Sequence, residues 1–276
     1  MTNNKVEIEN NLNLIRSLIT KHKRHDHIFA GVGMFIIISL TITLLVLFLD
    51  LVFDGYPRFN LDFLTNFPSR RATAAGILSA WVGSSLVLIV TFFAAVPLGI
   101  AAGVYLEEYA KKNWFSDLIE INVTNLAGVP SIIYGLLALG LFVYGFGLGQ
   151  TILTAGLTLA LLMLPIVIVA TREAIRAIPI HIREAAYAVG ATKWQVSLHH
   201  VIQYSYGGIL TGVIIGMARA IGETAPVITI GALTFIAFLP PSPVGLEPPF
   251  INFEWLEAGF TVLPIQMFNW ISRPQM

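Results

Sequence analysis

Hydrophobic residues fall into five long runs that are almost free of charge, unlike the short periodic stripes of a soluble protein. The runs cover residues 28–49, 77–106, 126–149, 151–170 and 207–239. A transmembrane helix needs about 20 mostly apolar residues, so each run is long enough to cross a bilayer. The first is too long for the apolar region of a signal peptide. The pattern therefore predicts an all-α membrane protein, a polytopic bundle of transmembrane helices.

The fifth run is too long for a single span. Pro226 divides it, because proline lacks the N–H that a helix interior needs. We expect a span over residues 207–225, followed by a segment, 227–239, that lies at the membrane interface or re-enters the membrane. Residues 240–276 hold seven of the 14 prolines and contain no further apolar run, so they predict an extramembrane segment.

Composition supports a membrane bundle and excludes several other classes. Hydrophobic residues make up 56% of the chain and charged residues 12%, whereas soluble domains carry about 25% charged residues. The formal net charge is zero, which argues against a nucleic-acid partner. The absence of cysteine excludes disulfides, thiolate metal sites and cysteine nucleophiles.

Basic residues are distributed unevenly between the two sides of the predicted bundle. Eleven lie on the same side as the N-terminus, namely Lys5, Arg16, Lys21, Lys23, Arg24, Lys111, Lys112, Arg172, Arg176, Arg183 and Lys193. Four, Arg58, Arg70, Arg71 and Arg273, lie on the other side. The positive-inside rule then predicts a cytoplasmic N-terminal segment (1–27), a transmembrane domain (28–276), a cytoplasmic loop (171–206) and an external segment (240–276).

The span over residues 207–225 carries two charges and a row of small residues. Gly208, Gly212, Gly216 and Ala220 follow one another at four-residue steps, which predicts a face for close helix packing. On a helical wheel, Arg219 and Glu223 fall on the same face. A charge in mid-membrane is costly and usually marks a substrate pathway, and arginine suits an oxyanion. The alternative is a structural ion pair.

The loop over residues 171–206 is unusually apolar and predicts short helices. Pro179 ends the first, the second runs over residues 182–189, and Gly190 is placed to cap it. Thr192 and Gln195 match a capping box that opens a third helix. The middle helix is rich in alanine and thin enough to lie in a groove on another protein. The alternative is a connector that lies on lipid headgroups.

This loop resembles the EAA motif of ABC importer permeases, in which a short helix docks on the ATPase subunit. Glu184, Ala185, Ala186 and Gly190 match the first half of the motif. Together with the loop, residues 125–143, 217–226 and 263–274 resemble the PstA-type permease subunits of phosphate-specific ABC transporters. The resemblance implies the ABC importer permease fold, the bacterial inner membrane and three partners. These are a sister permease in a heterodimer, a cytoplasmic ATP-binding subunit and an external phosphate-binding protein.

The resulting hypothesis is the permease subunit of an ATP-driven phosphate importer. Arg219 and Glu223 would line the pathway, and the loop would couple it to the ATPase. The alternatives are a permease for another oxyanion such as sulfate, or an ion-coupled carrier or channel. The chain has no GxxxxGK[ST] loop, so we expect no enzyme activity, no cofactor or metal, and ATP bound elsewhere. The family has one more final helix, so we expect a longer gene product that continues past Met276.

Overall fold

The computed structural model describes the backbone of residues 2–71, 74–111, 113–245 and 250–272, and their side chains except 2–22 and 24. The chain divides into two units, residues 1–60 and 61–276. The first unit holds α1 (Thr2–Gly55) and the short helix η1 (Tyr56–Arg58). Throughout the described ranges the chain is helical or irregular, and its single β-bridge joins Val244 to Ile251.

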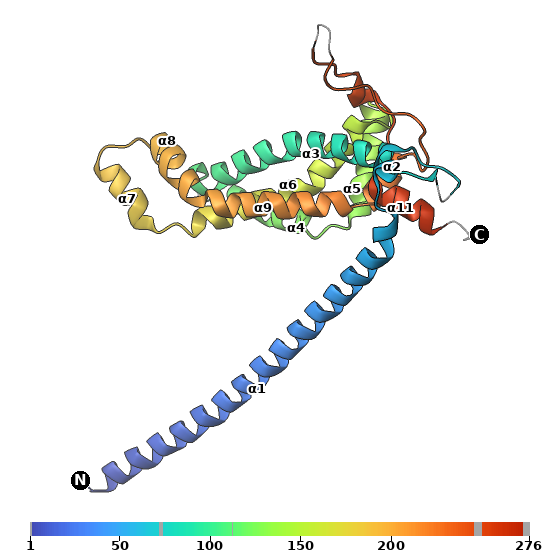
Figure 1. Ribbon diagram of the computed structural model, residues 1–276. Coiled ribbons are helices and arrows are strands. Elements are labelled where there is room, and N and C mark those ends of the chain that lie inside the picture. Colours follow the sequence, from blue (N-terminus) through green and yellow to red (C-terminus); the bar gives the residue numbers. More distant parts are fainter. Residues whose placement is uncertain (1, 72–73, 112, 246–249, 273–276) are drawn as a thin grey trace. The chain divides into compact units, whose positions relative to one another are not determined.

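The second unit (Figure 1) contains long, short and π-helical elements. They are α2 (Leu61–Thr65), α3 (Leu78–Val104), η3 (Tyr105–Tyr109), α4 (Trp114–Leu126), α5 (Ser131–Ala138), η4 (Leu139–Gly145), α6 (Ile152–Arg176), α7 (Ile180–Ala188), α8 (Lys193–Val196), η5 (Ser197–Val201), α9 (Ile202–Gly222), α10 (Ala225–Ile230), η6 (Glu254–Glu257) and α11 (Leu263–Ile271). Among the described residues of the two units, four stretches are long and apolar enough to span a membrane, one of them in α1, and a bent helix pair makes a possible fifth. The all-α membrane fold is therefore confirmed.

The helix α1 is longer than the span predicted over residues 28–49. No proline interrupts it before Pro57, which occupies the first turn of η1 and ends the regular helix. Its apolar stretch, His25–Arg58, has a mean hydropathy of 2.8. The described side chains of this stretch are apolar around most of the helix, as expected for a helix surrounded by lipid.

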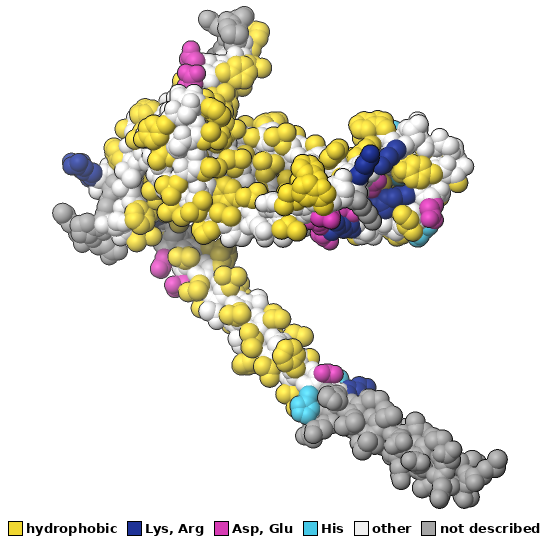
Figure 2. Space-filling view, turned by 180° about the vertical axis from the view of Figure 1, so that it is seen from behind, with side chains coloured by type: hydrophobic (Ala, Val, Ile, Leu, Met, Phe, Trp, Pro, Cys, Tyr) yellow, Lys and Arg dark blue, Asp and Glu magenta, His cyan; other side chains and the backbone are white. Residues whose placement is uncertain are grey.

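Three long helices, α3, α6 and α9, form the core of the second unit. They run side by side in Figure 1, and α6 packs against both α3 and α9. A buried cluster joins Val96, Met163, Val167 and Val213 from the three helices. Figure 2 shows apolar side chains over the outer face of these helices, with most of the basic side chains on that face gathered at the end that carries α7 and α8.

The span expected over residues 126–149 is shorter in the structure, Ser131–Gly145, and follows a sharp bend after α4. Asn113 caps the start of α4, and α4 ends at Leu126 before the chain turns. The pair formed by α4 and Ser131–Gly145 is bent by 104°. Pro130 explains the break, because it cannot donate to a continuing helix and it disfavours helical geometry in the residue before it.

The fifth predicted span also ends earlier than expected. The helix α9 stops at Gly222, and Glu223 has an extended backbone with φ −77° and ψ 118°. Pro226 lies in the first turn of α10, where its missing N–H costs nothing. The segment expected over residues 227–239 therefore contains only one short helix.

Part of the predicted extramembrane segment, residues 240–276, packs against the helices of the bundle. Trp255, Phe260 and Ile265 are buried in one cluster with residues of α3 and α6. The Ile152 N–H donates to the carbonyl of Ala258 at 3.1 Å. The burial of these large apolar side chains stabilises this packing.

Candidate functional site

The two charges of α9 form an ion pair at the end of the helix. The Nε atom of Arg219 donates to Oε1 of Glu223 at 3.1 Å. The Glu223 side chain is 16% exposed, whereas that of Arg219 is 44% exposed. A guanidinium carries five N–H donors, and this bond uses one of them. The pair thus leaves donor capacity on a half-exposed cation, as an oxyanion ligand would require.

The small residues of α9 lie against α6. The facing pairs are Gly208 with Ala174, Gly212 with Ala170 and Gly216 with Met163. A Cβ atom at Gly212 would collide with the Cβ atom of Ala170, so the two backbones approach closely because this position has no side chain. Arg219 lies beside this face and is more exposed than the helical wheel suggests. Glu223 is placed by the extended backbone after α9 and not by the helical repeat.

A short helix, α10, follows the ion pair and packs tightly on α5. A Cβ atom at Gly135 would lie 2.7 Å from the Cα atom of Pro226 and would collide with the Thr229 hydroxyl. The Thr229 hydroxyl donates to the Pro226 carbonyl at 2.8 Å. The helix α5 of the bent pair therefore packs against α10, which directly follows the segment that carries Glu223.

The loop helix α7 has the predicted helix-end signals. Gly190 has φ +84°, a conformation that favours glycine, and its N–H donates to Tyr187. The Ala191 N–H donates to Ala186, which completes a Schellman motif. The capping box of Thr192 and Gln195 is present in full, so the prediction that it opens a further helix is confirmed.

The four motif residues of the loop do not face the same way. Ala186 is 6% exposed and packs inward in a cluster with Ile175 and Val196. Glu184, Ala185 and Gly190 are exposed. Of the four residues predicted to meet the ATPase, three are therefore exposed, and Ala186 packs against the bundle. At helical spacing a single alanine of the motif fills the space against the bundle, while its neighbours lie on the outer side.

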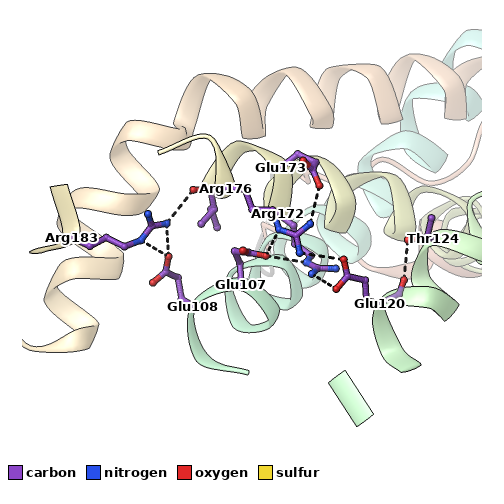
Figure 3. A network of polar contacts seen from close by, with 9 residues as sticks. Glu107, Glu108, Glu120, Thr124, Arg172, Glu173, Arg176 and Arg183 are labelled. Atoms are coloured by element: carbon purple, nitrogen blue, oxygen red, sulfur yellow. Dashed lines mark hydrogen bonds and ion pairs between the residues drawn. The ribbon is translucent and has the colours of Figure 1, made fainter. Parts of the chain in front are cut away.

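A cluster of ion pairs, not singled out in the sequence analysis, joins three helices at the end nearest to α7 (Figure 3). Arg172, which is 7% exposed, lies 2.7 Å from Glu120 of α4 and 3.4 Å from Glu107 of η3. Arg176 contacts the same two carboxylates at 3.2 and 2.9 Å. Two arginines of α6 therefore hold η3 and α4 together.

A separate pair connects the loop helix to η3. Arg183 of α7 donates from Nη2 to Oε1 of Glu108 at 2.9 Å. The two side chains are 15% and 7% exposed. Arg183 also donates to the carbonyls of Ile178 and Ile175, at 3.0 and 3.1 Å. One guanidinium thus binds the end of α6, the linker after it and the carboxylate of η3.

The sequence contained one signal for this cluster. Arg172 and Arg176 are four residues apart at the end of an apolar run, and Glu107 and Glu108 directly follow another run. Runs that end on the same side of a membrane bring such charges together. In the positive-inside pattern the arginines count only as charges on one side of the membrane, and the π-helical turn that directs the two carboxylates to different partners has no recognisable sequence pattern.

A comparison with family models matches residues 95–244 to the binding-protein-dependent transport system inner membrane component. The match begins in α3 and continues through the ion cluster, the loop and the Arg219–Glu223 pair. It therefore covers both parts of the candidate site.

Several ABC transporter permeases are similar to the chain. A probable ABC transporter permease protein of Bacillus subtilis, YqgI, is 32% identical over 86% of this chain and 77% of its own length. The phosphate transport system permease protein PstA of Haemophilus influenzae is 30% identical over 87% of this chain and 84% of its own. PstA of Mycobacterium leprae is 35% identical over 73% of this chain, and the match spans 62% of that relative.

Proposed function

Because the chain belongs to the family of binding-protein-dependent transport system inner membrane components, we propose that it is the permease subunit of an ATP-driven phosphate importer. The proposal that the substrate is phosphate rests on the similarity to PstA phosphate permeases, at 30–35% identity. The chain would form half of the translocation pathway and would catalyse no covalent step. ATP would be bound and hydrolysed by a separate subunit.

In this proposal the α7–α8 end of the bundle faces the cytoplasm, as does the N-terminal segment. The support is the excess of basic residues on that side, eleven against four. The exposed residues of α7, Glu184 and Ala185, would meet the ATP-binding subunit. A sister permease would complete the pathway, and a phosphate-binding protein would deliver substrate from outside.

Arg219 and Glu223 would act on the anion inside the pathway. Phosphate needs a compensating positive charge where water is scarce, and the half-exposed guanidinium offers a planar donor fork. Glu223 competes with the anion for that guanidinium. This competition keeps the site from holding phosphate too tightly, because conduction requires release as well as entry.

The test is transport by the complex of this chain with its sister permease, ATPase and binding protein in proteoliposomes. Labelled phosphate should accumulate with ATP, and unlabelled phosphate but not sulfate should inhibit this uptake. Inhibition by sulfate and not by unlabelled phosphate would assign the chain to another oxyanion. Accumulation that continues without the ATPase would instead indicate a carrier or channel.

A further inference from the structure

The π-helical turn η3, at the end of α3, makes contacts in several directions. Glu107 pairs with arginines of α6, and Glu108 pairs with Arg183 of α7. The next residue, Tyr109, lies under the ammonium group of Lys193 in α8, 4.9 Å from its ring centroid. One turn therefore contacts the end of α6 and both helices of the loop. Single π-turns within helices often occur at functional positions.

The pair between Glu108 and Arg183 is the shielded part of this arrangement. Only 7% of the Glu108 side chain and 15% of the Arg183 side chain are exposed. Two guanidinium nitrogens, Nε and Nη2, reach the same carboxylate oxygen at 3.1 and 2.9 Å. A charge-assisted, doubly donated contact fixes direction as well as distance. It holds α7 to α3 across a gap of 75 residues in sequence.

The covalent connections of α7 are short, and each contains a helix breaker. Pro179 precedes the helix, and Gly190 follows it with φ +84°. Such linkers can absorb a rotation of α7 without moving the helices on either side, as hinge residues do. The packing of Ala186 against α6 and α8 and the side-chain contacts to η3 restrict this rotation, and the contacts to η3 also join α7 to the block of α3, α4 and α6.

We propose that Glu108 and Arg183 are positioning residues that make α7 move as one body with α3 and α6. This rests on the proposed function, in which an ATPase displaces α7. With the pair intact, the displacement reaches the transmembrane helices. Without it, the linkers take up the motion, so ATP is hydrolysed with little transport. The pair then determines how much phosphate moves per ATP, whereas ATPase docking depends on the outer residues of α7.

The principal variant is Glu108→Gln, and the matched control is Glu173→Gln. The control makes the same charge change in the same region, but Glu173 is 64% exposed and pairs only within α6, with Arg176, among the contacts described. We expect Glu108→Gln to assemble with the ATPase and hydrolyse ATP. The phosphate moved per ATP should fall about tenfold, within the range of coupling effects measured for network residues. The control should match the wild type.

A second variant separates positioning from stability. Glu108→Leu combined with Arg183→Met leaves no unpaired buried charge, and such apolar replacements of buried pairs are often tolerated. If the pair serves stability alone, this double variant should transport as the wild type does, and the proposal is overturned. If it positions α7, the double variant should assemble normally and remain uncoupled.

A distance measurement tests the proposal without relying on phosphate or an ATPase. The chain contains no cysteine, so spin labels can be attached specifically at Ile180→Cys in α7 and Phe93→Cys in α3, both exposed positions. In the isolated permease we expect one narrow distance distribution, which broadens in Glu108→Gln and not in Glu173→Gln. Equal widths in all three would refute the positioning role, even if phosphate transport were confirmed.

Discussion

Two arginines of α6 contact the same two carboxylates but differ in burial, and this difference predicts unequal contributions to stability. The Arg172 side chain is 8% exposed and that of Arg176 is 40% exposed. Both reach Glu107 and Glu120. We expect Arg172→Gln to destabilise the protein clearly more than Arg176→Gln, although the two changes remove the same charge and Arg176 has one more partner, the exposed Glu173.

The magnitude follows from what each change leaves behind. Removing one partner of a fully buried ion pair costs about 3–5 kcal/mol. Arg176 still contacts both carboxylates after the loss of Arg172, so we lower this to about 2–3 kcal/mol. For the more exposed Arg176 the cost should be about 1 kcal/mol or less. The difference, about 1–2 kcal/mol, corresponds to roughly 2–8 °C in the unfolding midpoint of a chain of this size.

The assay is thermal unfolding of the purified chain in one detergent, with both variants and the wild type measured at one scan rate. A further variant, Arg172→Gln with Glu120→Gln, tests the cause. It removes a carboxylate that has lost its closest partner and should recover part of the loss. Equal shifts for Arg172→Gln and Arg176→Gln, or a larger shift for Arg176→Gln, would refute the argument from burial.

Three further predictions concern packing, docking and the pathway. Gly212→Val should lower the amount of folded protein in the membrane, because a side chain there collides with Ala170 and overpacking costs about 1–3 kcal/mol. The control Gly207→Val, with no atom within 4 Å of the added Cβ, should be tolerated. Equal expression of the two variants would contradict the packing prediction. Glu184→Lys should reduce co-purification of the ATP-binding subunit at an unchanged membrane level, whereas unchanged recovery would exclude this exposed face from docking; Gly190→Arg is a less specific test, since φ is +84° there. Arg219→Gln should abolish phosphate uptake while the complex still assembles, and Arg219→Lys, which keeps the charge but not the planar fork, should retain part of it; normal uptake by Arg219→Gln would remove this residue from the mechanism.

The features that could be predicted are those specified by nearby residues. The apolar runs indicated α3, α6 and α9, because length and hydropathy are sufficient to identify a span. Thr192 and Gln195 predicted the start of α8, since a capping box involves only four consecutive residues. Gly190 was placed correctly for the same reason.

The features that were missed depend on contacts between distant residues. The α4 segment carries Asp117 and Glu120 and precedes the apolar run over residues 126–149, yet Glu120 is paired with an arginine more than fifty residues away. Trp255 and Phe260 lie among prolines in sequence, and only the space between α3 and α6 explains their burial. The position of a buried charge or aromatic residue is determined by the residues that it contacts, and these cannot be identified from the sequence alone.

The central claim is that this chain forms an anion pathway driven by a separate ATPase. The most direct test uses proteoliposomes that contain the complete complex. Labelled phosphate and its binding protein are placed on one side of the membrane, and nucleotide is placed on the other. We predict accumulation of phosphate against its gradient with ATP, and none with a non-hydrolysable analogue. Equal accumulation with the analogue, or none with ATP from a fully assembled complex, would contradict the account.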